Sequence, residues 1–494
     1  MKEISVSNKN VRVRFAPSPT GWLHLGSART ALINYLFAKN QNGTFVLRVE
    51  DTDLERGDLA FLQQQINDLK WLGLSWDEGP DPDTQKDQGS YKPYLQSQRL
   101  PLYQKCVHQL IKMDKAYYCF LTDQEIDQMK KKALEEKTPF RVNSPYRNGD
   151  LQQAQERIKK GESAVVRFKV PEVKKNYVIE DIVRGKVTFP SDMVGDFVLL
   201  RSSGLPVYNF SCAVDDYFMK ISHVFRSEEH LANTLRQMMI FEAFNWPLPV
   251  YGHLSLILGE DRKKLSKRHG AVSCNEYKKQ GYLPGALLNF LALMGWNPKT
   301  EEEIFSLSEL INSFSLKGLN PAPGVFDKKK LNWINSQHLK QVTAESLWEM
   351  LTPYFKQKGL IFPNSSSWKE KAVLALRSSF SSLEEAVEVF SVLSKNHFEV
   401  HETAKDILKW PSTIEVLNEW KIFLKSYASQ EVSPEAFTKA CKEIQKKLGV
   451  KGKFLFMPIR AAVLGCPQGL ELKLIISLIK RDVLLKRICS LQKK

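Results

Sequence analysis

Hydrophobic and polar residues alternate at the start of the chain, and the pattern then changes to a helical period. Residues 11–15 alternate between apolar side chains and arginine, which predicts a strand with one buried face. Prolines and a glycine in residues 17–21 end this strand, because proline cannot donate a ladder hydrogen bond. Apolar residues then recur at spacings of three and four over residues 28–36, which predicts a helix with Ser27 as N-cap and Gly43 beyond its end.

The same order of strand and helix continues along the first half of the chain. Residues 45–49 form a short apolar run that predicts a buried strand, and a helical pattern over residues 59–72 ends at Gly73. We expect the sheet to resume at residues 197–200, and Arg226 lies where a later strand passes into a helix. Strands that alternate with helices predict a parallel sheet and an α/β fold.

Two other stretches have different patterns. Between residues 91 and 190, helical pieces alternate with shorter strands, which indicates an α+β insertion that splits the sheet domain. After residue 325 the helical period persists and strand signals are few, which predicts a helical second half. We therefore expect a sheet domain in two parts (1–90 and 191–252), the insertion (91–190), a connector (253–324) and two helical subdomains (325–395 and 396–494).

The first strand enters its helix through a turn that favours an anion. The N–H groups at the start of a helix have no partner within the helix, and here they point toward the turn. His24 supplies a ring donor in this turn, and Gly26 is a position without a side chain that would block a flat ligand. From this pattern alone, an ordinary turn with a surface histidine explains the residues equally well.

A basic segment lies about 240 residues after this turn. Residues 263–270 are KKLSKRHG, and they follow an apolar segment and Gly259, which suggests a mobile basic loop that leaves a strand. A run of charges is usually a solvated face. The run therefore gains meaning only in combination with the histidine turn.

The charge balance favours a polyanionic partner. The chain has 494 residues, with 71 Lys and Arg against 55 Asp and Glu, and its net charge is +16. Such an excess favours nucleic acid, although charge alone leaves an anionic membrane surface open. We expect no membrane span and no secretory signal, and the seven cysteines without paired spacing suit reduced thiols in the cytoplasm.

The two motifs in this order resemble the paired signatures of class I aminoacyl-tRNA synthetases. They are HLGS at residues 24–27 and KLSKR at residues 264–268. Further segments are similar to the bacterial-type glutamyl-tRNA synthetases, and the similarity covers nearly the whole chain. These segments are SPTG (18–21), RVEDTD (48–53), YNFSCAVDD (208–216), HVFRSEEHLANT (223–234) and FMPIRAAVLG (456–465).

The resemblance implies a fold and an activity. The fold would be the Rossmann-like parallel sheet of class I synthetases, split by an insertion that holds the acceptor end of tRNA and followed by an all-helical anticodon-binding half. The activity would be that of a glutamate–tRNA ligase, with ATP, L-glutamate and tRNA(Glu) as substrates and Mg²⁺ as the phosphate counterion. A cytoplasmic monomer is expected.

The resemblance also implies site residues. His24 and Lys267 would be the catalytic donors toward the triphosphate, because phosphoryl chemistry needs charge placed where it develops. Glutamate has two carboxylates and one ammonium, so its site needs two guanidinium groups and one anion. Arg14, Arg226 and Glu50 provide this set. The other expected residues are Thr20, Gly26, Lys264 and Ser266 at ATP, and Ser18 and Tyr208 at glutamate.

Three departures or weaker assignments qualify this picture. Cys212 stands where some relatives carry asparagine, and we do not count it as a ligand. Some relatives bind zinc in the insertion through a Cys-x-Cys pair, but this chain has Cys119 and Leu121, so we predict no zinc. Arg377 is a candidate for contacting the third anticodon base, and Trp333, Trp368 and Trp410 are weaker candidates for contacting bases.

Four alternatives to this activity differ in what they predict. A glutaminyl enzyme would end in β-barrels, whereas this tail is helical. A truncated paralogue that modifies tRNA would lack the last roughly 170 residues. A non-discriminating enzyme would also charge tRNA(Gln), and a catalytically inactive RNA-binding protein would use the basic surface alone.

Overall fold

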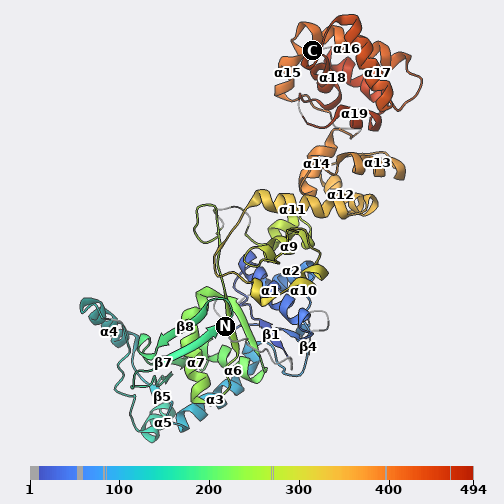
Figure 1. Cartoon of the computed structure of the whole chain (residues 1–494). Coiled ribbons are helices and arrows are strands. Elements are labelled where there is room, and N and C mark those ends of the chain that lie inside the picture. Colours follow the sequence, from blue (N-terminus) through green and yellow to red (C-terminus); the bar gives the residue numbers. More distant parts are fainter. Residues whose placement is uncertain are drawn as a thin grey trace. The chain divides into compact units, whose positions relative to one another are not determined.

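The computed structural model describes most of the chain, in two compact units. The described residues are 11–52, 59–81, 84, 86–138, 140–266, 268, 270, 272–394, 398–467 and 469–492. Unit 1 contains residues 1–276 and 287–327, and unit 2 contains residues 277–286 and 328–494. Each unit has a hydrophobic core of its own and is described by itself (Figure 1).

Parallel strands form the centre of unit 1. Strand β1 (Arg12–Phe15) pairs in parallel with β2 (Thr44–Leu47), and β10 (His223–Ser227) pairs in parallel with β11 (Val250–Leu254). The residue before β10 donates its backbone N–H to the carbonyl oxygen of Arg12 at 2.9 Å, so β10 begins beside β1. The predicted α/β fold with a parallel sheet is confirmed.

Helices cover these strands. Helix α1 (Leu25–Asn40) packs on β1, β2 and β10, and most of its residues are buried, so it lies within the core rather than on its surface. Helix α6 (Tyr208–Phe218) packs against α7 (Leu231–Ala243). The other helices outside the insertion that lie wholly or partly in unit 1 are α2 (Leu59–Leu72), α8 (Cys274–Lys279), α9 (Pro284–Leu293) and α10 (Leu307–Ser313).

In its described residues, the insertion has two antiparallel sheets and three α-helices. Its three-stranded sheet has the order β5 (Ala116–Cys119), β6 (Val165–Phe168), β9 (Phe197–Leu200). Strands β7 (Asn176–Asp181) and β8 (Gly185–Pro190) form a hairpin. Helix α4 projects from the rest of unit 1 (Figure 1) and buries none of its residues. The helices are α3 (Leu100–Lys112), α4 (Asp123–Glu135) and α5 (Leu151–Lys159).

The expected return of the chain to the parallel sheet at residues 197–200 is wrong. These residues form β9, which pairs antiparallel with β6 of the insertion. The ring of Phe197 stacks on Phe168 with centroids 5.0 Å apart, which accounts for this pairing. A short apolar run indicates a buried strand, but its partner depends on contacts distant in sequence.

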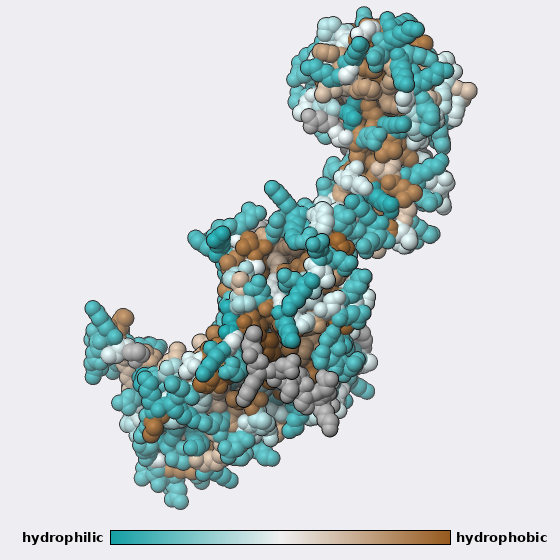
Figure 2. Space-filling model, in the orientation of Figure 1, coloured by the Kyte–Doolittle hydropathy of each residue, from teal (hydrophilic) through white to brown (hydrophobic). Residues whose placement is uncertain are grey.

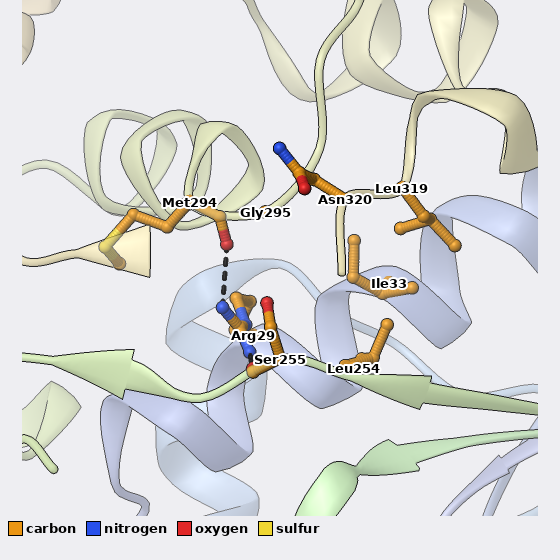
Figure 3. A pocket seen from close by; sticks show the side chains of 8 residues that line it. All are labelled: Arg29, Ile33, Leu254, Ser255, Met294, Gly295, Leu319 and Asn320. Carbon is orange, nitrogen blue, oxygen red and sulfur yellow. Dashed lines mark hydrogen bonds between the residues drawn. The ribbon is translucent and has the colours of Figure 1, made fainter. Parts of the chain in front are cut away.

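A buried arginine joins α1 to two later segments of unit 1. Arg29 donates from Nη1 to the carbonyl oxygen of Met294 at 2.7 Å and from Nη2 to that of Ser255 (Figure 3). Burial lowers the pKa of Arg29 to about 10.

Short strands complete this unit, namely β3 (Gly79–Asp81), β4 (Lys86–Gln88), β12 (Ile257–Leu258) and β13 (Gly324–Val325).

Unit 2 is helical throughout its described residues, as predicted. Its core includes the fully buried rings of Trp420 and Phe390. The helices are α11 (Lys328–Gln341), α12 (Ala344–Gln357), α13 (Ser366–Leu376), α14 (Leu383–Ser391), α15 (Glu402–Leu408), α16 (Pro411–Ser426), α17 (Pro434–Leu448), α18 (Lys453–Leu464), α19 (Leu472–Ile475) and α20 (Arg481–Leu491).

The visible surface of the chain is largely hydrophilic, with scattered apolar patches (Figure 2). Among the helices in the described ranges, none has the length and apolar character needed to cross a bilayer.

Candidate active site

The first part of the site is the start of helix α1. The helix begins at Leu25, and His24 is its N-cap, because its Nδ1 accepts the backbone N–H of Gly26 at 3.1 Å. The prediction that Ser27 is the N-cap is therefore wrong, and Ser27 is an exposed residue of the first turn. Histidine is not among the preferred N-cap residues, so the usual capping signal pointed to the serine.

The capping bond fixes the protonation of His24. Burial lowers its pKa, and the nearby ammonium of Lys264 lowers it further, whereas Glu229 and Glu276 act in the opposite direction. The imidazole is therefore neutral at pH 7. Since Nδ1 accepts a hydrogen bond, the single proton lies on Nε2. His24 thus presents a neutral N–H donor at the positive end of a helix.

The late basic segment is paired with the chain around His24. His24 forms an antiparallel bridge with Ser273, and Leu25 donates its N–H to the carbonyl oxygen of Val272 at 2.9 Å. Lys264 pairs with Glu229, with 2.5 Å between Nζ and Oε1. The structure therefore brings together the two motifs that are 240 residues apart in the sequence.

Individual residues of the two motifs are placed as follows. Lys267 lies outside the described residues, so its expected role stays a prediction. Ser266 is half-buried within the loop, and Thr20 is exposed in the turn before α1. At Gly26, an added Cβ would meet only the Nδ1 atom of His24, at 3.5 Å, so this face of the first turn is open.

Behind the turn lies a buried cluster of arginine and carboxylate groups. Arg14, on β1, places Nε 3.0 Å from Oδ1 of Asp216, and Arg48 places Nη1 2.7 Å from the same oxygen. Arg48 also reaches Glu50, with 3.2 Å between Nη2 and Oε1. The thiol of Cys212 lies 3.6 Å from Nη2 of Arg48. The predicted residues Arg14 and Glu50 are therefore joined through Arg48, which the sequence argument did not assign.

These contacts determine the charge of each group. Burial alone would raise the pKa of Asp216, but the guanidinium groups of Arg14 and Arg48 outweigh it and hold the pKa at about 2. Burial raises the pKa of Glu50 despite the same two arginines. Burial, with Asp216 and Glu50, raises the pKa of Cys212 to about 12, so its thiol is neutral. A neutral thiol agrees with leaving Cys212 out of the charged ligand set.

Arg226, on β10, forms the other side of the cluster. Its Nε donates to Nε2 of His253 at 3.1 Å, Nη1 donates to Gln237 at 2.8 Å, and Nη2 donates to Thr234 at 2.8 Å. All three partners are uncharged acceptors. Arg226 is only 4% exposed, so its charge is buried. Polar side chains stabilise this charge, and none of these three partners is a carboxylate.

Tyr208 lies between the two sides. Its hydroxyl is 3.3 Å from Nδ1 of His230. Burial raises the pKa of Tyr208, and the charges of Arg226, Glu50 and Arg14 all act on its phenol. The structure thus brings together four of the five predicted glutamate-binding residues. The fifth, Ser18, is exposed in the turn after β1 and accepts the side-chain N–H of Gln65 at its carbonyl oxygen.

Of the unassigned residues Arg48, Asp215 and Asp216, helix periodicity could have indicated only Asp216. Tyr208, Cys212 and Asp216 are four residues apart on α6, so they share one face of the helix. Asp215 accepts a hydrogen bond from Nε of Arg99 at 2.7 Å. Two buried aspartates on one helix require buried cations nearby, and Arg48 is one of these cations.

The insertion places Cys119 in an aromatic and cationic environment. Cys119 is buried, and its Sγ lies 3.5 Å from the hydroxyl of Ser144. Beside it, Phe120 and Tyr146 meet edge to face at 5.3 Å, and Arg157 lies 3.9 Å above the ring of Phe120. The prediction that this segment binds no zinc stays a prediction.

The predicted anticodon residues are distributed over unit 2. Arg377 is the C-cap of α13, and its Nη1 donates to the carbonyl oxygen of Lys340 at 3.3 Å. Trp368 donates its ring N–H to Leu478 at 2.9 Å and packs on other rings, so it supports the fold. Trp333 is 43% exposed, and Trp410 packs against Phe454 at 5.3 Å.

Comparison with known proteins covers nearly the full length of the chain. Residues 10–333 match the family described as tRNA synthetases class I (E and Q), catalytic domain, and residues 346–491 match an anticodon binding domain. The glutamate–tRNA ligase of Bdellovibrio bacteriovorus is 49% identical over 478 residues, which are 97% of each chain. Glutamate–tRNA ligase 1 of Caldicellulosiruptor saccharolyticus is 43% identical over 483 residues, covering 97% of this chain and 98% of that one.

Solved structures agree with these matches. The crystal structure of a glutamate tRNA ligase from Elizabethkingia meningosepticum, in complex with its amino acid, superposes with a TM-score of 0.87 at 29% identity. It covers 98% of this chain and 100% of that chain. The resemblance predicted from the sequence is thereby confirmed. This chain belongs to the class I tRNA synthetases for glutamate and glutamine, and within that family to the glutamate–tRNA ligases.

Proposed function

We propose that this chain activates L-glutamate with ATP and transfers it to the 3′ end of tRNA(Glu). The observation that carries the proposal is the buried cluster in which Asp216 and Arg48 join Arg14 to Glu50, with Tyr208 and Arg226 close enough for their charges to interact. Glutamate carries two carboxylates and one ammonium. Two guanidinium groups and one carboxylate therefore complement its charges, and arginine grips a carboxylate with two parallel hydrogen bonds.

The partners of Arg226 support its role as a carboxylate site. A guanidinium has five N–H groups, and the bonds to His253, Gln237 and Thr234 use three of them. Because these partners are uncharged, they hold the guanidinium in place without neutralising it. Arg226 can therefore attract a ligand carboxylate with its full charge, whereas the charge of Arg14 is already offset by Asp216.

In the first step, a glutamate carboxylate oxygen attacks the α-phosphorus of ATP, and the bond to pyrophosphate breaks. The Nε2–H of His24 and the ammonium of Lys267 would stabilise the charge that develops on the phosphate oxygens. Gly26 leaves room for the adenine, and Thr20, Lys264 and Ser266 would add contacts to the nucleotide. We expect Mg²⁺ to arrive with the ATP phosphates, as their counterion.

In the second step, a hydroxyl of the terminal ribose of tRNA attacks the glutamyl carbonyl, and AMP leaves. The insertion would hold the acceptor end, and Arg377 of unit 2 would contact the third anticodon base. The net charge of +16 suits the phosphate backbone of such a partner. We expect the chain to act as a monomer.

Charging of purified transcripts tests the proposal. With ATP and labelled glutamate, we expect acid-precipitable glutamyl-tRNA from the tRNA(Glu) transcript, together with pyrophosphate exchange that depends on glutamate and tRNA. The tRNA(Gln) transcript, charged in parallel, separates a discriminating from a non-discriminating enzyme. A protein that binds tRNA but shows neither charging nor exchange would instead be a basic RNA binder, and the proposal would fail.

A further inference from the structure

A buried hydrogen-bond chain lies behind Arg226 and begins in the insertion. It runs from Asp181, the last residue of β7, through His253 on β11 to Arg226 on β10. Oδ2 of Asp181 is 2.6 Å from Nδ1 of His253, and Nε2 of His253 is 3.1 Å from Nε of Arg226. Asp181 and Arg226 are each 4% exposed, and His253 is fully buried. Water therefore cannot readily replace any of these bonds.

The surroundings of Asp181 keep its carboxylate ionised. Its Oδ1 accepts the backbone N–H groups of Val183 and Arg184, each at 2.9 Å, and that of His253 at 3.1 Å. Burial acts to raise the pKa of Asp181, but the hydrogen bonds from the His253 ring and these backbone groups outweigh it and lower the pKa. An ionised carboxylate only accepts hydrogen bonds. The proton of the short contact therefore belongs to Nδ1 of His253.

The second nitrogen of His253 then has to be an acceptor. Burial lowers the pKa of His253, and Arg226 lowers it further although Asp181 opposes both, so the ring is neutral. A neutral imidazole with its proton on Nδ1 has a lone pair on Nε2. This lone pair faces Nε of Arg226 at 3.1 Å and the hydroxyl of Thr234 at 3.1 Å. With the opposite tautomer, two N–H groups would point at each other.

We propose that Asp181 and His253 are positioning residues for glutamate recognition. The Asp181 carboxylate selects the His253 tautomer that accepts the Arg226 Nε–H, and this bond sets the direction of the guanidinium. The inference rests on the proposed function, because it takes Arg226 to bind a carboxylate of glutamate. It adds two residues that lie outside the pocket, one of them in the insertion.

A purely structural role is the alternative. The loop after β7 is joined to β11 through Ile182, which donates its N–H to the carbonyl oxygen of Tyr251 at 2.9 Å. Arg184 donates Nε to the carbonyl oxygen of His253 at 3.2 Å and pairs with Glu228. Asp181 could therefore serve only to fasten the hairpin. Such a role would affect stability and all substrates alike, whereas positioning of Arg226 affects glutamate selectively.

Three variants of the full-length chain, and one control variant, distinguish the two roles in a steady-state charging assay. In Asp181→Asn, the amide N–H would donate to Nδ1 and favour the tautomer that opposes Arg226, and in His253→Phe the acceptor is removed. For both we expect KM for glutamate to rise about tenfold, since a hydrogen bond to a charged group is lost, with KM for ATP within about twofold. His253→Gln offers an amide oxygen that can accept the same N–H, and we expect it to restore most of the affinity.

The control is a second buried histidine of the same sheet. His223 is 5% exposed and contacts Ser222 rather than the pocket, and we expect His223→Gln to leave both KM values unchanged. Parallel rises of both KM values in Asp181→Asn and His253→Phe would show a structural role and overturn the inference. An unchanged KM for glutamate in these two variants, if they are folded, would overturn it as well.

Two further measurements keep the result unambiguous. If Arg226→Lys leaves KM for glutamate unchanged, the assignment of Arg226 itself fails; if it raises KM while the Asp181 and His253 variants do not, only the positioning inference fails. Nitrogen-15 spectra of histidine-labelled wild-type protein, with the His253 signal identified from His253→Gln, report the tautomer without destabilising substitutions. We expect a protonated Nδ1, and a protonated Nε2 would overturn the inference.

Discussion

His24 caps helix α1 and, in the proposed function, also donates to the triphosphate of ATP. Its Nδ1 caps helix α1 through the N–H of Gly26, and this bond leaves the proton on Nε2. Asparagine can accept the same capping bond but has no donor at the position of Nε2. We therefore expect His24→Asn to lower the rate of glutamate activation about 100-fold at unchanged stability, because one preorganised donor is lost. Pyrophosphate exchange and thermal unfolding measure the two effects.

The matched variant His24→Ala separates the two functions. It should lose the same activity and, in addition, about 1 kcal/mol of unfolding free energy, because the cap is lost. An active His24→Asn enzyme would show that Nε2 has no part in the chemistry.

Asp216 is the counterion of two buried arginines and makes stability depend on pH. Its pKa of about 2 lies below the ordinary value of 3.8, so its contribution of about 2 kcal/mol is complete above pH 4 and is lost as pH falls through 2. At pH 7 we expect Asp216→Asn to lose about 3 kcal/mol or more, because Arg14 and Arg48 stay buried without this charge. Denaturant unfolding between pH 7 and pH 2 measures the difference.

The difference in unfolding free energy between wild type and Asp216→Asn should decrease as pH falls from 4 to 2. A difference that stays constant would contradict this account. Asp127→Asn is the control, because Asp127 only pairs with Lys130 on the exposed helix α4. Its substitution should change the unfolding free energy little at any pH.

At the scale of elements, two chain segments lie so close together that position 43 requires glycine. The sequence suggested this glycine only as the end of a helix. A Cβ on Gly43 would lie 2.5 Å from the carbonyl oxygen of Val11 and 2.8 Å from its Cβ. Gly43→Ala should therefore push β1 and β2 apart and cost about 2 kcal/mol. Gly21→Ala is the control, because nothing lies within 4 Å of its added Cβ. Equal urea midpoints for the two variants would contradict this explanation.

Elements with a strong local period could be predicted, and those defined by distant partners could not. The apolar spacing of α1 and the alternation of β1 predicted a helix and a strand, but not that most residues of α1 are buried or that Arg14, on the polar face of β1, is buried too. The start of α1 was missed because a histidine caps it, and β9 was assigned to the wrong sheet because a four-residue apolar run does not name its partner. Arg48 and Asp216 were within recognised segments, but their pairing joins residues 168 positions apart.

At the scale of the whole molecule, composition predicted a polyanionic partner, and periodicity predicted a sheet domain followed by a helical one. The neighbourhood of the two signature motifs could not follow from local patterns. It depends on the pairing of the chain around His24 with Ser273, which closes a loop of almost 250 residues. Only the resemblance to a family related these motifs before the structure did.

In the proposed function, Lys267 joins all of these scales, because its ammonium, from the late motif, would act on the nucleotide bound beside the early motif. The decisive comparison is between pyrophosphate exchange measured with glutamate and tRNA, and the binding of tRNA, in Lys267→Ala and wild type. We predict that exchange falls about 100-fold, as for the loss of one preorganised donor, while the Kd for tRNA stays within about twofold. Equal losses of exchange and tRNA binding would contradict a catalytic role for Lys267 and leave it as one basic contact among many.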